Sequence, residues 1–181
     1  MVWSSRVAKL ALRDRILDSI ALRGDEKILD VGCGRGLLLI GAAKRIKSGK
    51  ATGVDIWNPQ DLSGNSPEAA KENAKLEGVL DKVRIESHDA RKLPYPDANY
   101  DVVVSSLALH NIEDREGRDQ AVREMWRVLK PGGKLVIHDI FKTGEYAEVL
   151  RNQGAKSVEL SPMSWLWCVP ARTVTAHNPV P

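Results

Sequence analysis

Three glycines at alternate positions, Gly32, Gly34 and Gly36, are the most distinctive feature of the sequence. They follow a short apolar run, "KILDV", which contains the carboxylate of Asp30. Glycines spaced in this way let a backbone pass very close to a bound molecule, because none of them carries a Cβ. The stretch therefore predicts a binding loop between a buried strand and a helix, with an acid at its start.

Two classes of ligand suit such a loop. A dinucleotide-binding loop has the pattern GxGxxG, with pyrophosphate at the N-terminus of the following helix. Counted from Gly32, its third glycine would fall at position 37, which is Leu37, whereas the glycine stands at position 36. Asp30 would repel a pyrophosphate but attract a cation. A ligand with an ammonium head, an adenosine and no phosphates satisfies both observations, and S-adenosylmethionine is such a ligand.

Two further acids follow later apolar runs. Asp55 ends the run "ATGVD", 19 residues beyond Gly36, where a carboxylate can accept the hydroxyls of a ribose. Asp89 follows the third apolar run, where it can accept the exocyclic amine of adenine. Open α/β sheets bind ligands at the C-terminal ends of their strands, so we expect these acids to gather there.

Apolar runs alternate with helical segments, which predicts an α/β fold with a parallel sheet. Five runs are typical of strands buried on both faces: "KILDVG", "ATGVDI", "KVRIESHD", "YDVVVSSL" and "KLVIHDI". The expected helices cover residues 5–23, 37–46, 67–76, 117–129 and 145–152. The last runs, "SVELSP" and "ARTVTAHN", have no helix between them and predict an antiparallel hairpin. We expect a doubly wound, mostly parallel seven-stranded sheet that closes with this C-terminal hairpin.

Four stretches in order, "LDVGCGRG", "GVDI", "HDARKLPYPDANYDVVVSSLALHNI" and "REMWRVLKPGGKLVIHD", resemble a class I S-adenosylmethionine-dependent methyltransferase. The resemblance is to the small type that includes quinone-biosynthesis methyltransferases. It covers residues 27–141 closely and "ARTVTAHNP" more loosely. It implies a Rossmann-like fold, S-adenosyl-L-methionine as the cofactor and S-adenosyl-L-homocysteine as the product.

The resemblance also implies roles for the cofactor-binding residues. The three glycines would lie under the methionine part, Asp30 near its ammonium, Asp55 at the ribose and Asp89 at the adenine. The other expected cofactor contacts are Ile56 and Ala90 beside the base, Trp57 over the adenine, Cys33 in the glycine loop and Ser105 at the end of the fourth strand.

The end of the fourth strand run, "VVVSSLALHNI", should face the methyl group. His110 is the expected catalytic base there, since histidine exchanges protons near neutral pH. The expected substrate pocket consists of Ser106, His110, Trp165 and Trp167. The sequence "SSLA" differs from the [Asn/Asp]-Pro-Pro-[Tyr/Phe] run of methyltransferases that act on planar amines, which disfavours that class of substrate. We expect in-line methyl transfer to a small, apolar or aromatic acceptor, and a structural role for His138.

Other functions stay open on the sequence alone. A catalytically silent partner subunit that binds S-adenosylmethionine is the main alternative. An NAD-dependent oxidoreductase is disfavoured by the glycine spacing. An aminopropyltransferase would need additional acids for a polyamine, and none stand out.

Composition and length limit these choices further. The 181 residues are 43% hydrophobic and 28% charged, which is typical of a folded globular protein. We expect one domain over residues 1–181, with an N-terminal helix in 1–24, a cofactor-binding core in 25–141, and the last helix and closing hairpin in 142–181.

Charge and cysteine content bear on partners and location. A net charge of +3, from 27 basic and 24 acidic residues, is too small to indicate nucleic-acid binding. Two cysteines without a CxxC pair predict free thiols and no metal site. No apolar run reaches the roughly 18 residues of a membrane span. We expect a cytoplasmic protein acting on a small molecule. Association with a membrane surface stays open, as does membrane association through a further N-terminal segment of the natural chain.

Overall fold

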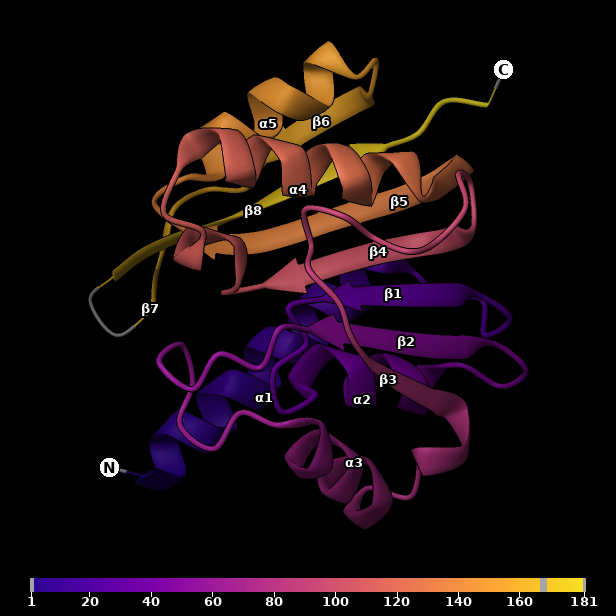
Figure 1. Cartoon of the computed structure of the whole chain (residues 1–181), viewed down its shortest axis with the longest axis vertical. Helices are drawn as coiled ribbons and strands as arrows, with labels where there is room; N and C mark the ends of the chain where they lie inside the picture. The colour runs from indigo at the N-terminus through magenta and orange to yellow at the C-terminus, as the bar shows by residue number, and fades with distance from the viewer. Residues whose placement is uncertain (1, 167–168, 181) are drawn as a thin grey trace.

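The computed structural model describes residues 2–166 and 169–180 and contains one mixed sheet flanked by helices (Figure 1). The strand order is β3–β2–β1–β4–β5–β8–β6, and the short strand β7 pairs with β8. The strands are β1 (Lys27–Val31), β2 (Lys50–Asp55), β3 (Val83–Ser87), β4 (Tyr100–Ser106), β5 (Leu129–Ile140), β6 (Lys156–Leu160), β7 (Ser164–Leu166) and β8 (Val169–His177). The helices are α1 (Val2–Ile20), α2 (Leu37–Arg45), α3 (Pro67–Leu76), α4 (Arg115–Arg127) and α5 (Thr143–Asn152), with single 3₁₀ turns η1 (Leu80–Lys82) and η2 (Leu109–Asn111).

The pairing confirms the expected α/β fold. Strands β1 to β5 pair in parallel, and β8 runs antiparallel to both β5 and β6. One strand was not expected, because the segment between β6 and β8 was predicted to be only a turn. Residues Ser164–Leu166 instead form β7, whose Ser164 Oγ also donates a hydrogen bond to the carbonyl of Ala171 in β8.

Local chemistry sets the helix ends. Helix α3 begins at the expected residue, because the Ser66 hydroxyl accepts a hydrogen bond from the Ala69 N–H and Pro67 suits the first helical position. Helix α4 begins two residues earlier than expected, since Asp114 caps it by accepting from the Gly117 N–H. It also ends two residues earlier, because Leu129 already pairs with Tyr100 in the sheet.

Two apolar layers hold the helices against the sheet. One layer contains Val103 and Ile137 of the strands together with buried residues of α4 and α5, whereas the other contains Val104 and Val136 with residues of α1 and α2. Neighbouring residues of one strand thus pack into opposite layers, as expected for strands buried on both faces. Figure 1 shows the C-terminal ends of β1, β2 and β4 at one edge of the sheet, where the connecting loops gather. This edge carries the site.

Candidate functional site

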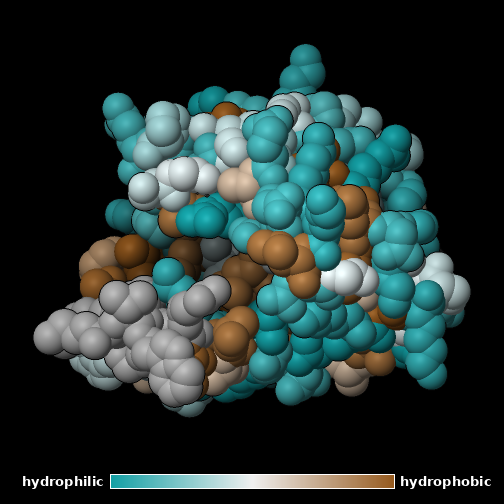
Figure 2. All heavy atoms as spheres, turned by 90° about the horizontal axis from the view of Figure 1, so that it is seen from below, coloured by the Kyte–Doolittle hydropathy of each residue, from teal (hydrophilic) through white to brown (hydrophobic). Residues whose placement is uncertain are grey.

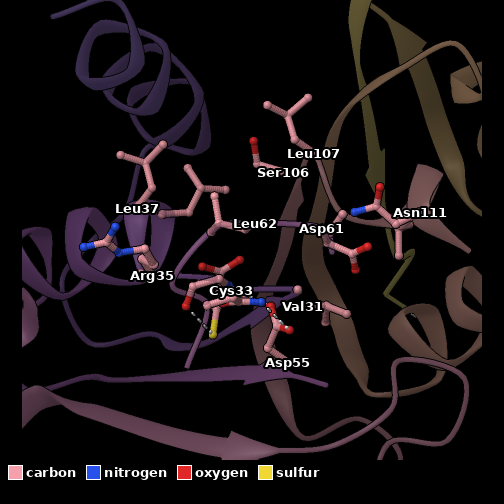
Figure 3. A pocket seen from close by; sticks show the side chains of 18 of the residues that line it. Val31, Cys33, Arg35, Leu37, Asp55, Asp61, Leu62, Ser106, Leu107 and Asn111 are labelled. Carbon is pink, nitrogen blue, oxygen red and sulfur yellow. Dashed lines mark hydrogen bonds between the residues drawn. The ribbon is translucent and has the colours of Figure 1, made fainter. Parts of the chain in front are cut away.

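A cavity of about 1030 Å³ lies at the C-terminal ends of the parallel strands. Its walls come from the glycine loop, the β2–α3 connection, the β4–α4 connection and α1. Figure 3 shows Ser106, Leu107 and Asn111 on one side of it, with Arg35 and Leu37 on the other. In the space-filling view of Figure 2, a hollow toward the left of the face is bordered by hydrophobic atoms in brown. The cavity thus combines polar groups with an apolar wall, as small-molecule sites do.

The glycine loop is packed too tightly for side chains. Gly32, Gly34 and Gly36 all have left-handed backbones, with φ of 71°, 51° and 89°. A Cβ on Gly32 would lie 2.2 Å from the Cβ of Ala108 in the β4–α4 connection. The N–H of Gly32 donates to the carbonyl of Val54 at 2.8 Å, which ties the loop to β2. The loop is therefore a fixed surface of bare backbone along the cavity.

Asp30 lies under this loop, at the C-terminal end of β1. It is 2% exposed, and its carboxylate accepts one hydrogen bond, from the Leu39 N–H in the first turn of α2 at 2.9 Å. Burial raises the pKa of Asp30 to about 7; the Leu39 N–H opposes this rise and the charge of Asp55 adds to it. Asp30 is thus an acid that a nearby cation would help to ionise.

Asp55 ties three segments together at the end of β2. Its Oδ2 accepts from the Gly34 N–H at 2.8 Å, and its Oδ1 accepts from the Trp57 N–H at 2.7 Å and from Asn65 Nδ2 at 3.4 Å. Ile56 is exposed and lines the cavity. Trp57 is not among the lining residues, since its Nε1 donates to the Ser87 hydroxyl and its ring packs on the apolar layer of α1 and α2.

Asp89 follows β3 and forms a bidentate ion pair with Arg91, with N–O distances of 2.6 to 3.0 Å. It also accepts from the Arg91 N–H at 2.8 Å. Hydrogen bonding to the Arg91 guanidinium lowers the pKa of Asp89, so this acid stays ionised. Asp89, Ala90 and Arg91 all line the cavity.

His110 and Asp139 form a second polar centre at the cavity. The His110 ring lines the cavity, and its Nδ1 lies 2.5 Å from Asp139 Oδ1. Asp139 is fully buried and accepts three more hydrogen bonds, from the N–H groups of His110 and Ile140 and from the Tyr146 hydroxyl. Four donors surround this carboxylate, so the buried charge is well satisfied.

The remaining predicted residues are placed as follows. Cys33 is buried in the glycine loop and lines the cavity, as does Ser106. Ser105 is 1% exposed inside the core and is not among the lining residues. Trp165 is 70% exposed and also outside the lining, although Val169 on the paired strand is part of it. Trp167 lies outside the described residues.

His138 is a buried histidine of β5 whose Nδ1 pairs with the Thr173 hydroxyl at 3.0 Å. Its Nε2 has no hydrogen-bond partner among the described residues, and burial lowers its pKa. It does not line the cavity.

Sequence reasoning missed Asp139, which lies behind His110, and several residues that line the cavity. Asp139 stands at the C-terminal end of β5 in "VIHD", the same kind of position as Asp30 and Asp55, so this signal was available. Arg91 follows Asp89 by two residues and gave no separate signal. The lining residues that were not predicted include Lys9, Leu10, Leu12 and Arg13 of α1, and Asn58, Asp61, Leu62 and Asn65 of the β2–α3 connection.

In the described part of the chain, no helix is long and apolar enough to span a membrane. The described residues also contain no group of three or more His, Cys, Asp or Glu arranged to hold a metal ion.

Residues 29–137 match the model of a methyltransferase domain family. The chain is 37% identical over 132 residues to "27-O-demethylrifamycin SV methyltransferase" of Amycolatopsis mediterranei, covering 73% of this chain and 45% of that protein. It is also 37% identical over 126 residues to a "Ubiquinone/menaquinone biosynthesis C-methyltransferase UbiE" of Laribacter hongkongensis, covering 70% of this chain and 48% of that one. The chain thus spans about half the length of these curated relatives.

Solved structures share the fold at low sequence identity. A "SAM dependent methyltransferase from Aquifex aeolicus" superposes with a TM-score of 0.70 at 21% identity, covering 91% of this chain and 88% of that one. The "[4+2]-Cyclase SpnF" superposes with a TM-score of 0.79, also at 21% identity, covering 95% and 82%. The family match shows that this chain belongs to the methyltransferase-domain family. S-adenosylmethionine is the cofactor implied by that family.

The residues present fit that cofactor. The glycine loop presents bare backbone along the cavity, and the acids at the ends of β1 and β2 and after β3 suit an ammonium, two hydroxyls and an amine. The same acids would repel the pyrophosphate of a dinucleotide.

Proposed function

We propose that the protein transfers a methyl group from S-adenosylmethionine to a hydroxyl-bearing small apolar molecule, with His110 as the general base. The observation that carries this proposal is the contact between His110 and the buried Asp139 at one end of the cavity. A base is needed only where the acceptor arrives with a proton on its reacting group. An oriented imidazole beside the cavity therefore supports a hydroxyl acceptor.

The geometry supports a defined protonation state for His110. The Asp139 carboxylate can only accept hydrogen bonds when ionised, so its partner Nδ1 carries the proton. Nε2 is then the ring nitrogen that takes a proton from the acceptor. Backbone bonding of the His110 N–H to the same carboxylate fixes the residue a second time, so the imidazole is held in place before the acceptor enters.

The proposed reaction moves one methyl group and one proton. When bound, S-adenosylmethionine would supply a methyl group on a sulfonium, with the electron pair of the carbon–sulfur bond left on sulfur. The acceptor oxygen forms the new bond to carbon while its proton passes to His110 Nε2. His110 later releases that proton to water.

We assign the other end of the cavity to the cofactor. Asp30 would lie near the ammonium, Asp55 at the ribose, and Asp89 and Ala90 at the adenine. The conformation of the glycine loop supports a close approach of the methionine part to its backbone. A partly buried carboxylate is stable in its ionised form when a cation or a hydroxyl pairs with it.

The wall around His110 supports an apolar acceptor. Leu107, Leu109, Ile112, Ile140 and Val169 line this region of the cavity. Burial of apolar surface would provide most of the affinity, whereas Ser106 and Asn111 would orient the polar group. The name of one relative refers to a 27-O-demethylrifamycin, which agrees with an oxygen acceptor, whereas the other relative is named a C-methyltransferase.

The test uses S-adenosylmethionine with a radioactive methyl group and a panel of phenols, hydroquinones and macrocyclic alcohols. We expect turnover of at least one compound, and a kcat at least about 100-fold lower in His110→Gln, with the Kd of S-adenosylhomocysteine within about twofold of wild type. His177→Gln is the matched control, because His177 is exposed at the far end of β8. Undiminished turnover in His110→Gln would contradict the assigned base, and cofactor binding without turnover of any compound would favour the silent subunit.

A further inference from the structure

The β2–α3 connection, residues 56–66, lies directly on the glycine loop. A Cβ added to Gly34 would meet Leu62 Cδ2 at 3.2 Å. The connection has its own internal structure, since Asn58 Nδ2 donates to Asp61 Oδ1 and Asn58 Oδ1 accepts from the Gln60 N–H. Asn65, near its end, lines the cavity and contacts Asp55. The connection is therefore a built wall of the cofactor end.

The acceptor capacity of Asp55 is nearly used up by the protein. A carboxylate offers about four acceptor sites. Three are taken by the N–H groups of Gly34, Trp57 and Asn65. One site remains, on Oδ2, whereas a ribose presents two hydroxyls that each need an acceptor. The second hydroxyl must find another partner or give up a hydrogen bond.

Asn65 supplies such an acceptor. Its Nδ2 is the atom that faces Asp55, because an amide oxygen placed there would repel the carboxylate. Its Oδ1 therefore points elsewhere, and this oxygen is buried without a hydrogen-bond partner among the described residues. A buried amide oxygen without a partner is costly, so an unpaired one beside a ligand cavity indicates a ligand contact.

We infer that Asn65 is a second ribose ligand: its Oδ1 accepts one ribose hydroxyl of the cofactor while Asp55 accepts the other. The inference rests on the cofactor placement under Proposed function, and it divides between two residues a contact that the sequence assigned to Asp55 alone. Asn65 thereby brings the β2–α3 connection into direct contact with the ribose. It acts on cofactor binding and not on the acceptor.

A binding cycle with modified ligands tests this division. Calorimetric titration would measure the Kd of S-adenosylhomocysteine and of its 2′-deoxy and 3′-deoxy analogues, for wild type and for Asn65→Ala. We expect Asn65→Ala to weaken binding of the parent ligand about five- to tenfold, the size of one net hydrogen bond. In Asn65→Ala, one of the two deoxy analogues should bind as tightly as the parent ligand, because the contact to its missing hydroxyl is already gone. The other analogue should bind more weakly than the parent ligand by the same factor as in wild type.

Asn58→Ala is the matched control, because Asn58 lies in the same connection with its amide bonded inside it. Its effect should be equal for all three ligands. Equal weakening of all three by Asn65→Ala would overturn the inference and leave Asn65 a role in loop folding only. If Asn65→Ala unfolds, Asn65→Ser keeps one small acceptor, and the same cycle decides. Failure of wild type to bind S-adenosylhomocysteine would overturn the proposed function and the inference together.

Discussion

The two ends of the cavity are each built around a buried carboxylate, but the two acids are solvated very differently. Asp30, at the proposed cofactor end, accepts a single hydrogen bond within the described part of the chain, from the Leu39 N–H. Asp139, at the proposed acceptor end, accepts four, including one from the ring of His110. Both side chains are excluded from water to the same degree. The number of donors, and not burial, separates them.

This difference suits two kinds of task. A buried carboxylate with one donor is poorly compensated for its loss of water, which raises its pKa. A cation that binds beside it would therefore lower this pKa strongly. A carboxylate with four donors holds those donors in place and has little capacity for another partner. The cofactor end is therefore arranged to respond to a charged ligand, whereas the acceptor end is arranged to fix a histidine.

The largest expected effect comes from Asp139→Asn. The carboxamide can donate to His110 Nδ1, which would move the ring proton to Nε2 and remove the basic atom from the cavity. We expect kcat to fall by about 100- to 10,000-fold. The Kd of S-adenosylhomocysteine should stay within about twofold of wild type. Steady-state turnover and calorimetric titration measure the two quantities.

A purely structural role of Asp139 would produce a different pattern. The double variant with His110→Gln should be no slower than His110→Gln alone if Asp139 acts through the histidine. A further loss in the double variant would contradict the comparison. Tyr146→Phe removes one donor to Asp139 and leaves the His110 contact, so it should cost much less activity.

Much of the cofactor end was predictable from the sequence, because its signals are local. The glycine loop and Asp30 lie within seven residues of each other, and the apolar run before Asp55 marks the end of a strand. The parallel sheet then brings these positions to one edge, as any doubly wound sheet does. The order of elements, and hence the fold, followed from the same alternation of apolar runs and helices.

The acceptor end was less predictable, because it depends on contacts distant in sequence. His110 and Asp139 are 29 positions apart, and they meet only because Ser106 pairs with His138 where β4 and β5 lie side by side. No periodic pattern marks the orientation of Asn65 either, since it lies in a connection without regular structure. Strand β7 was missed for a similar reason: three residues are too few to show an alternation.

A smaller effect is expected from pH at the cofactor end. The pKa of Asp30 is about 7 in the folded protein and has its ordinary value of 3.8 when unfolded. Between these values the folded state keeps a proton that the unfolded state has lost, so the free energy of unfolding should fall as pH rises from about 4 to 7. The fall is on the order of 4 kcal/mol at most. Asp30→Asn should remove it.

The measurement is urea unfolding of wild type and Asp30→Asn without ligand, at several pH values between 4.5 and 8. Ionisation of other groups, including Asp89, affects both proteins alike and cancels in the difference. We expect the variant to gain stability relative to wild type as pH rises, and the gain to level off above pH 7. A difference that is independent of pH would show that Asp30 is ionised throughout, and would remove the contrast with Asp139.

The smallest expected effect tests how far the acceptor end extends. Trp165 in β7 was predicted to line the substrate pocket, but its side chain is largely exposed and only Val169 of the adjacent β8 reaches the cavity. We expect Trp165→Ala to change KM for an acceptor by less than about twofold, because little buried contact area is lost. Val169→Ala should raise KM more, since its methyl groups contact the cavity directly. A larger rise in KM for Trp165→Ala than for Val169→Ala would mean that the β7–β8 hairpin folds over a bound acceptor, and that the acceptor end responds to its ligand as the cofactor end does.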